Sequence, residues 1–286
     1  MTKNKNLNTL ITLECNSKLL DLSTPAIMGI LNLTDDSFYD GGQHNSIKKA
    51  LLQTEKMLDD GAKIIDIGAY SSRPKAKHIS HDEEWQRLEK TLQIINKEFT
   101  QAILSVDTFR SEIARRSIDN GADIINDISA GNLDPQMFDT VADLNVPYIM
   151  MHMQGTPQTM QDNPHYDCIE KEVSNYFLSK VKSLQQKGLK KIIIDPGFGF
   201  GKTLEHNYQL LNNLEELHTL ELPILVGVSR KSMVYKVLET DAKNSLNGTT
   251  AIHTLCLSKG ASILRAHDVK EAVECVKLIN FAKNQL

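Results

Sequence analysis

Residues 102–127 read AILSVDTFRSEIARRSIDNGADIIND, and this stretch contains the unit from which the fold can be predicted. One apolar run ends at Asp107 and a second ends at Asn126. Between them, Ser111–Ile118 has the apolar spacing of a helix, and Gly121 follows as a helix stop. An apolar strand, a helix and another apolar strand predict a parallel βαβ crossover.

The same unit recurs along the chain, because eight apolar runs, each with a polar or charged residue at or near its end, alternate with helical periodicity. Eight buried parallel strands separated by helices are what a closed (β/α)8 barrel requires, and the active site of such a barrel lies at the strand C-termini. A doubly wound open sheet shares the alternation, but eight units with polar residues at one end favour an α/β fold with a single (β/α)8 TIM barrel. The runs are Ala26–Leu31 before Asn32, Lys63–Ile67 around Asp66, Ala102–Val106 before Asp107, Asp123–Ile125 before Asn126 and Asp127, Pro147–Met151 before His152, Lys191–Ile194 before Asp195, Pro223–Val228 before Ser229, and Ser262–Leu264 before Arg265 and His267.

No linker-like segment divides the 286 residues, so we predict one domain over residues 1–286. Residues 1–25 precede the first barrel strand as an N-terminal extension. Within it, Leu10–Cys15 and Ser17–Leu22 predict a short β-hairpin that caps the bottom of the barrel. A disordered leader is the alternative for residues 1–8.

The composition excludes several classes of function. A formal net charge of −4 argues against binding nucleic acid through broad phosphate neutralisation, so any anion site must be local. No run of about 18 apolar residues is present to span a membrane, and the N-terminus lacks the apolar core of a signal peptide. The four cysteines are scattered, without a close pair that would indicate zinc or redox chemistry. We therefore expect a cytoplasmic protein with reduced thiols and no membrane or nucleic-acid partner.

The densest motif is Ile192–Thr203, IIIDPGFGFGKT, in which an apolar strand ends in a carboxylate and a glycine-rich turn follows. A nucleotide-binding phosphate loop is excluded by spacing, since the position that such a loop gives to its first glycine holds Pro196. The turn still allows backbone N–H groups to approach a ligand closely. Asp195 is then a candidate acceptor for a flat amino-heterocycle, or a residue that merely caps the next helix.

Asp107 and Asn126 lie at strand ends like Asp195, and each alone is compatible with an ordinary turn residue. Three such side chains at one barrel mouth form a suitable pocket for a ring with adjacent N–H and NH₂ donors. Positive charge enters from Ser229–Ser232, after strand seven, and from Arg265 with His267 on strand eight. Loops after strands seven and eight commonly bind phosphate in barrels, so we predict an anion site there.

Asn32 opens a polar loop, residues 32–42, directly after strand one. The loop offers oxygen ligands of the kind Mg²⁺ uses when it binds through few protein groups, several waters and substrate phosphates. An ordinary connecting loop is the alternative.

These residues lie in motifs that, in this order and over essentially the whole chain, resemble those of the dihydropteroate synthase family, the pterin-binding enzymes of folate synthesis targeted by sulfonamides. The motifs are Met28–Asn32, Asp36–Phe38, Ser72–Pro74, Ser105–Thr108, Asn126–Ile128, Met151–Gly155, Asp195–Lys202, Ser229–Ser232 and Arg265–Val269.

The resemblance implies a transferase in which 4-aminobenzoate displaces diphosphate from (7,8-dihydropterin-6-yl)methyl diphosphate, giving 7,8-dihydropteroate. It implies Mg²⁺ as cofactor and a homodimer formed through the late helices. By resemblance, Asp107, Asn126, Asp195 and Lys231 hold the pterin, with Met151 or Met150 on its face; Asn32 with Mg²⁺, Arg265, His267 and Ser72 hold the diphosphate; Arg73, Pro74, Phe200 and Ser232 form the aminobenzoate pocket; and Gly227 is a further substrate-binding position.

The departures from the family pattern concern two loops. The family commonly has Thr-Pro-Asp where this chain has Thr34-Asp35-Asp36, and Gly-Gly-Glu-Ser-Thr-Arg-Pro-Gly where it has residues 68–75, GAYSSRPK. Losing the proline removes a fixed φ, so we expect the first loop to order less readily. The sequence leaves sulfonamide sensitivity open.

Two other functions remain. Methyltetrahydrofolate methyltransferases resemble this family in their pterin-holding positions, but they have no need for an anion site built from Ser229–Ser232, Arg265 and His267. An inactive pterin-binding paralogue is the non-enzymatic alternative, and it would have lost anion ligands that this chain keeps.

Overall fold

The barrel predicted from the apolar runs is present in the structure, a computed structural model that describes residues 12–33, 43–71 and 78–285. Its eight parallel strands pair in the order β8-β7-β6-β5-β4-β3-β10-β9. A parallel bridge between Ile194 and Ile224 joins the two ends of this sheet, so the strands close into a barrel. The strands are β3 (Ala26–Asn32), β4 (Ile64–Gly68), β5 (Ile103–Asp107), β6 (Ile124–Asp127), β7 (Tyr148–Met151), β8 (Ile192–Asp195), β9 (Leu225–Val226) and β10 (Ile263–Ala266).

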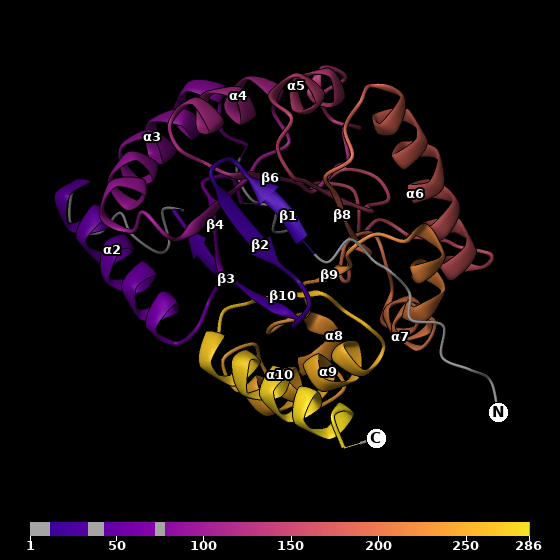
Figure 1. The fold of residues 1–286 in the computed structure, drawn as a ribbon. Helices are drawn as coiled ribbons and strands as arrows, with labels where there is room; N and C mark the ends of the chain where they lie inside the picture. The colour runs from indigo at the N-terminus through magenta and orange to yellow at the C-terminus, as the bar shows by residue number, and fades with distance from the viewer. Residues whose placement is uncertain (1–11, 34–42, 72–77, 286) are drawn as a thin grey trace.

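The helices lie around the outside of the barrel strands (Figure 1). Every second residue of a strand faces outward and packs on them: Ile65 and Ile67 of β4, for example, share one apolar cluster with buried helix residues such as Leu88. The helices described are α2 (Gln43–Asp59), α3 (His81–Glu98), α4 (Ser111–Asp119), α5 (Met137–Leu144), α6 (Ile169–Gln186), α7 (Leu204–Asn212), the 3₁₀ helix η1 (Leu214–Leu220), α8 (Ser232–Tyr235), α9 (Leu246–Ser258) and α10 (Val269–Lys283). None of the helices in the described residues is both long and apolar enough to span a bilayer.

The other strand residues face the interior, which is apolar at the end where the strands begin. Because side chains alternate along a strand, Ile64 faces inward and Ile65 outward, and the same holds for Ile103 and Leu104. The bottom layer consists of Ala26, Met28, Ile64, Ile103, Ile124, Ile149, Ile193, Leu225 and Ile263.

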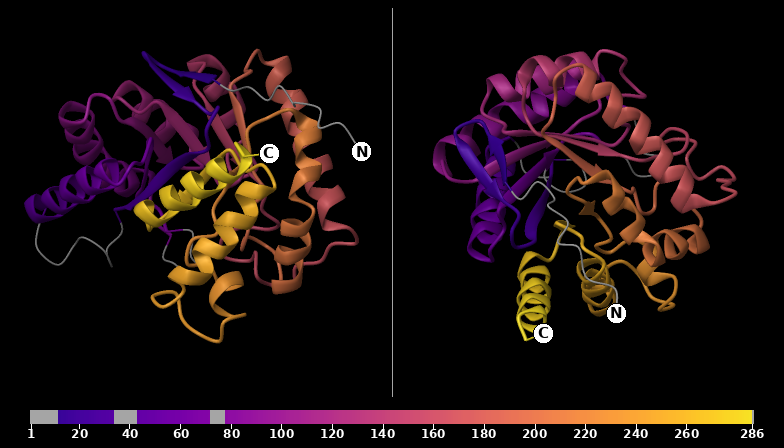
Figure 2. Two further views of the ribbon diagram at one scale, coloured as in Figure 1. Left: turned by 60° about the horizontal axis from the view of Figure 1, so that its bottom comes forward. Right: turned by 45° about the vertical axis from the view of Figure 1, so that its right-hand side comes forward.

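The predicted N-terminal hairpin closes this end, as Figure 1 and both views of Figure 2 show. Strands β1 (Thr12–Cys15) and β2 (Lys18–Asp21) pair antiparallel around a turn in which Asn16 has a φ of 54°. Leu13 and Leu20 are 1% and 2% exposed and pack on the bottom layer. The hairpin is confirmed from residue 12 onward; residues 1–11 lie outside the described part of the chain.

Candidate active site

The interior position above the bottom layer is polar on several strands, and it centres on Asp66 of β4. This carboxylate is fully buried and accepts three side-chain hydrogen bonds: Ser105 Oγ donates at 2.6 Å, Asn126 Nδ2 at 3.1 Å and Arg265 Nε at 2.6 Å. Ser105 and Asn126 come from β5 and β6, and Arg265 comes from β10. Asp66 therefore links four strands inside the barrel.

Arg265 also reaches Asp107 at the end of β5, where its Nη2 donates to Oδ2 at 3.1 Å. Desolvation raises the pKa of Asp107 to about 7, with Arg265 opposing the rise and the negative charge of Asp66 adding to it. We call Asp66, Ser105, Asp107, Asn126 and Arg265 the mouth cluster. It brings together three residues singled out in the sequence, Asp107, Asn126 and Arg265.

Asp195, at the end of β8, is 6% exposed and its Oδ1 accepts a hydrogen bond from the N–H of Gly197 at 2.8 Å. Burial raises its pKa, and the positive charge of Lys231 opposes that rise. Lys231 follows β9; burial lowers its pKa to about 8, against the effect of Asp195. At the barrel mouth, the charge of each residue therefore favours the ionised form of the other.

Lys231 is held by the glycine-rich turn after β8. Its Nζ donates to the carbonyl of Phe198 at 2.6 Å and lies 4.5 Å from the centroid of the Phe200 ring. Gly227 lies between the two basic residues, because a Cβ at this position would be 3.8 Å from both Arg265 Cβ and Lys231 Nζ. Ser232 begins α8, directly after Lys231.

Met151 belongs to a third apolar cluster, and Phe200 packs against it. It contains Tyr70, Ile79, Phe109, Ile128, Met151, Met153 and Met160, with Leu133 and Phe200 packed against it. Met150 faces outward and belongs to the cluster between strands and helices instead. The alternation along β7 thus places Met151, and not Met150, beside the mouth.

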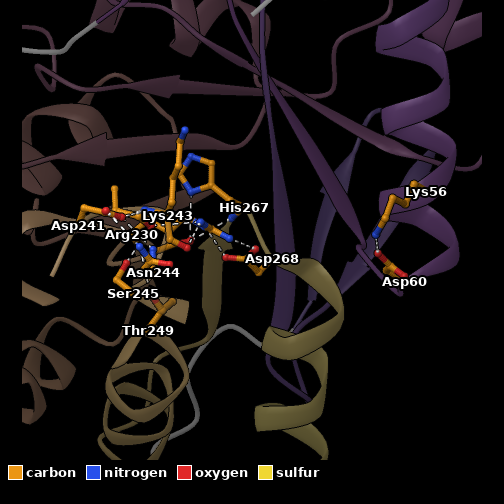
Figure 3. A network of polar contacts seen from close by, with 12 residues as sticks. Lys56, Asp60, Arg230, Asp241, Lys243, Asn244, Ser245, Thr249, His267 and Asp268 are labelled. Carbon is orange, nitrogen blue, oxygen red and sulfur yellow. Dashed lines mark hydrogen bonds and ion pairs between the residues drawn. The ribbon is translucent and has the colours of Figure 1, made fainter. Parts of the chain in front are cut away.

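His267 follows β10 and is exposed, with its Nδ1 3.1 Å from Ser229 Oγ. Desolvation of the ring, followed by the positive charge of Arg265, lowers its pKa to about 4, so the imidazole is neutral near pH 7. Arg230 has a different place: its Nε and Nη2 donate to the two carboxylate oxygens of Asp268 at 2.8 and 2.7 Å (Figure 3). The basic motif after β9 therefore contributes Lys231 to the mouth, while Arg230 fastens the loop to the start of α10.

Asn32 ends β3 beside Asp107. A Cβ at Gly68 would lie 3.6 Å from Asn32 Oδ1 and 3.7 Å from Asp107 Oδ2, so both oxygens lie close to Gly68. Within the described residues, no three His, Cys, Asp or Glu side chains are grouped to hold a metal ion. A cation at Asn32 would need further oxygens from a ligand and water, which is how Mg²⁺ commonly binds.

Some predicted residues cannot be placed. Ser72, Arg73 and Pro74 lie outside the described residues, as do Asp35 and Asp36.

A family model described as "pterin binding enzyme" matches residues 28–267. The chain is 45% identical over 262 residues to the dihydropteroate synthase of Escherichia coli K12, covering 91% of this chain and 92% of that protein. It is 43% identical to the dihydropteroate synthase of Haemophilus influenzae, with 93% and 97% covered.

The chain belongs to the dihydropteroate synthase family. As a member of this family it is an enzyme, a transferase. Solved structures of the family share its fold: a Yersinia pestis dihydropteroate synthase with a sulfonamide drug complex superposes with a TM-score of 0.90 at 40% identity, covering 96% of this chain and all of that one. The Xanthomonas albilineans dihydropteroate synthase in complex with 7,8-dihydropteroate gives 0.85 at 34% identity, with 95% and 98% covered. The family and the fold predicted from the sequence are confirmed.

Asp66 was missing from the site residues predicted on the basis of dihydropteroate synthase resemblance. The signal for it was available, because it is the single charged residue in the strand sequence IIDIG. A carboxylate buried in a strand needs partners, and two of the three partners of Asp66, Asn126 and Arg265, are predicted site residues.

Proposed function

We propose that the chain joins 4-aminobenzoate to (7,8-dihydropterin-6-yl)methyl diphosphate and releases diphosphate. The aniline nitrogen forms a bond to the methylene carbon, the bond from that carbon to the diphosphate oxygen breaks, and the amine gives up one proton to solvent. The observation that carries the proposal is the arrangement of Asp107, Asn126 and Asp195 around one mouth with Lys231 and Arg265 among them.

The acidic side of this arrangement suits the pterin. Carboxylate and amide oxygens accept hydrogen bonds from the ring N–H and NH₂ groups, and Met151 offers an apolar contact beside them. An aniline amine is a weak nucleophile, so we infer that the carbon–oxygen bond loosens before the new bond is complete. Asp107 and Asp195 then supply negative charge near a carbon that becomes cationic, fixed in place before the reaction begins.

The diphosphate end is assigned to Asn32, His267, Ser229 and Arg265. With a pKa of about 4, His267 acts as a neutral hydrogen-bond donor, and the negative charge of diphosphate beside it would raise that pKa and favour the charged form. Asn32 is the residue that would hold Mg²⁺, an ion that commonly binds through few protein groups. When bound, Mg²⁺ would neutralise negative charge on the departing diphosphate.

The direct test is to incubate the purified protein with both substrates and follow dihydropteroate and diphosphate. We expect diphosphate release that requires Mg²⁺ and the presence of both substrates. Protein that binds the pterin diphosphate without forming dihydropteroate would be an inactive pterin-binding paralogue. Methyl transfer from methyltetrahydrofolate to a corrinoid would indicate the methyltransferase alternative.

We also propose a homodimer formed through the late helices. On α10, Leu278 and Phe281 are 71% and 69% exposed, and because they are three residues apart they lie on the same side of the helix. Leu255 on the neighbouring helix α9 is 47% exposed. We expect dimers in sedimentation experiments and monomers after Leu278→Asp combined with Phe281→Asp; a monomeric parent protein would contradict the proposal.

We also propose that the chain forms a single domain and that the protein is located in the cytoplasm. The hairpin residues Leu13 and Leu20 share a core with the barrel strands, which supports one folding unit. All four cysteines are unpaired thiols, which suits a reducing compartment.

A further inference from the structure

Lys202, at the end of the glycine-rich turn, is a buried lysine to which the proposed function assigns no role. It is 3% exposed, and its Nζ lies 2.9 Å from His152 Nδ1, 2.9 Å from the carbonyl of Gly197 and 3.0 Å from the carbonyl of Phe200. A fourth, longer contact of 3.4 Å joins it to the carbonyl of His152. The lysine thus holds both the first and the fourth residue of the turn Gly197–Gly201.

All the direct partners of this ammonium are uncharged. Its three N–H donors match three close acceptors, so the group is satisfied although no carboxylate touches it. Burial lowers the pKa of Lys202 to about 7, and the charge of Asp195 opposes this effect. His152 is suited to accept, because burial lowers its pKa to about 2 and leaves the ring neutral.

The turn that Lys202 holds lies directly against the backbone after β7. Gly197 has a φ of 69°, and a Cβ there would be 1.9 Å from the carbonyl oxygen of His152. Further hydrogen bonds fix the turn: Tyr166 Oη donates to the carbonyl of Gly201 at 2.7 Å, Gln161 Nε2 donates to the carbonyl of Gly199 at 2.9 Å, and the N–H of Gly199 donates to Asn207 Oδ1 at 2.7 Å. Lys202 differs from these anchors because one side-chain atom contacts two carbonyls of the turn, those of Gly197 and Phe200.

Phe198, Gly199 and Phe200 of the same turn lie against Lys231. The carbonyl of Phe198 accepts from its Nζ, the Phe200 ring lies 4.5 Å from its Nζ, and a Cβ at Gly199 would lie 3.3 Å from its Cδ. One five-residue turn therefore supplies carbonyls to two lysines: those of Gly197 and Phe200 to Lys202, and that of Phe198 to Lys231. If the turn changed shape at Lys202, the Phe198 carbonyl and the Phe200 ring, which orient Lys231, would be displaced.

We propose that Lys202 is a positioning residue for the pterin end of the site: by holding the carbonyls of Gly197 and Phe200 against His152, it fixes the turn that orients Lys231 and Phe200. The inference rests on the proposed function, because it takes Lys231 as the pterin-binding lysine. It assigns Lys202 no contact with substrate.

The test measures binding of the pterin diphosphate without aminobenzoate, by calorimetry, in Lys202→Met and Lys202→Gln. Lys202→Met removes every donor, and we expect the dissociation constant to rise roughly tenfold or more, from the loss of charge-assisted hydrogen bonds that hold the turn. Lys202→Gln keeps two N–H donors for the carbonyls, and we expect it to recover part of the affinity. If Lys202→Met fails to fold, Lys202→Gln carries the test with an expected loss of roughly threefold or more.

Tyr166→Phe is the matched control, because it removes an uncharged anchor of the same turn. We expect it to lower the melting temperature while changing pterin affinity less than either lysine variant. Wild-type affinity in a folded Lys202 variant would overturn the inference, as would equal losses in Lys202→Gln and Tyr166→Phe. Failure of the parent protein to bind the pterin diphosphate would instead contradict the proposed function.

Discussion

The two ends of one barrel interior differ in chemistry, although the same strands line both. At the bottom, Ile64 and Ile103 belong to a wholly apolar layer that Leu13 and Leu20 cover. Two residues further along the same strands, Asp66 and Ser105 begin the mouth cluster. Because the side-chain period is two, β4 and β5 each give an apolar side chain to the bottom and a polar one to the top.

The bottom layer contributes to the stability of the barrel, whereas the mouth cluster contributes to its chemistry. The bottom is stabilised by removal of apolar surface from water, which needs no specific partner. The mouth cluster has buried charge that is tolerated only because Arg265 bonds both Asp66 and Asp107. Substitutions at the bottom should therefore affect folding alone, whereas those at the top should affect activity and in one case folding as well.

The largest expected effect is that of Asp66→Ala, which removes the acceptor of three side chains and leaves Arg265 partly uncompensated. Breaking a buried ion pair from one side costs about 3 to 5 kcal/mol of unfolding free energy, and we expect a loss in that range together with most of the activity. Denaturant unfolding and steady-state kinetics provide the measurements. The double variant Asp66→Leu with Arg265→Met should recover much of the stability but none of the activity; unaltered stability in Asp66→Ala would show that Asp66 does not organise the cluster.

Next is Leu20→Ala in the hairpin. Truncating a buried leucine costs about 2 to 5 kcal/mol, and we expect about 3 kcal/mol here because the side chain closes the bottom layer. Its neighbour Leu19 is 64% exposed, so Leu19→Ala is the matched control and should change the unfolding free energy little. For the folded fraction, kcat/KM should be the same in both variants and the parent. A selective loss of activity in Leu20→Ala would mean that the two ends are coupled.

The barrel was predictable because strands buried on both faces appear as uninterrupted apolar runs, and such runs are local patterns. The mouth cluster was predictable only in part. The three partners of Asp66 lie 39, 60 and 199 residues away along the chain, so no local spacing indicates that they meet. Asp107, Asn126 and Asp195 could be found because each lies at or next to the end of its strand.

Neighbouring residues with like chemistry were the harder case. Arg230 and Lys231 are adjacent and basic, yet Arg230 has a φ of 56° and bonds Asp268, while Lys231 enters the mouth. Met150 and Met151 are also adjacent, and only the pairing of β7 shows which of them faces the interior. The direction of a side chain depends on the backbone at that residue, which residue type alone does not determine.

Lys231→Ala and Arg265→Ala test the charges at the top directly. Each should lower kcat/KM by at least about 10²-fold, corresponding to a lost charged contact of about 3 kcal/mol in the transition state. Lys18 is the matched control at the bottom, where it pairs with Asp123 at 2.8 Å. Lys18→Ala should leave kcat/KM within about twofold of the parent, the expectation for a residue remote from the transition state. Near-parental rates in both mouth variants would refute the assignment of these residues.

The smallest effect is a pH dependence that only the mouth should show. With a pKa of about 7, Asp107 becomes protonated as the pH falls, so kcat/KM should drop below that value. With a pKa of about 8, Lys231 loses its proton as the pH rises, and kcat/KM should drop again above it. The charged groups acting on these two residues are Asp66, Glu84, Asp127, Asp195 and Arg265.

Each limb should approach tenfold per pH unit, about 1.4 kcal/mol, and the apparent values belong to the coupled cluster as a whole. Asp66→Asn identifies the acid limb, because removing the negative charge of Asp66 lowers the pKa of Asp107 and should move that limb to lower pH. Lys18→Ala should leave the pH profile unchanged, since Lys18 and Asp123 lie at the bottom of the barrel, remote from Asp107 and Lys231. A pH profile that is flat between about 5.5 and 9.5 would mean that neither group controls the reaction, because ionisation at either pKa falls inside that window.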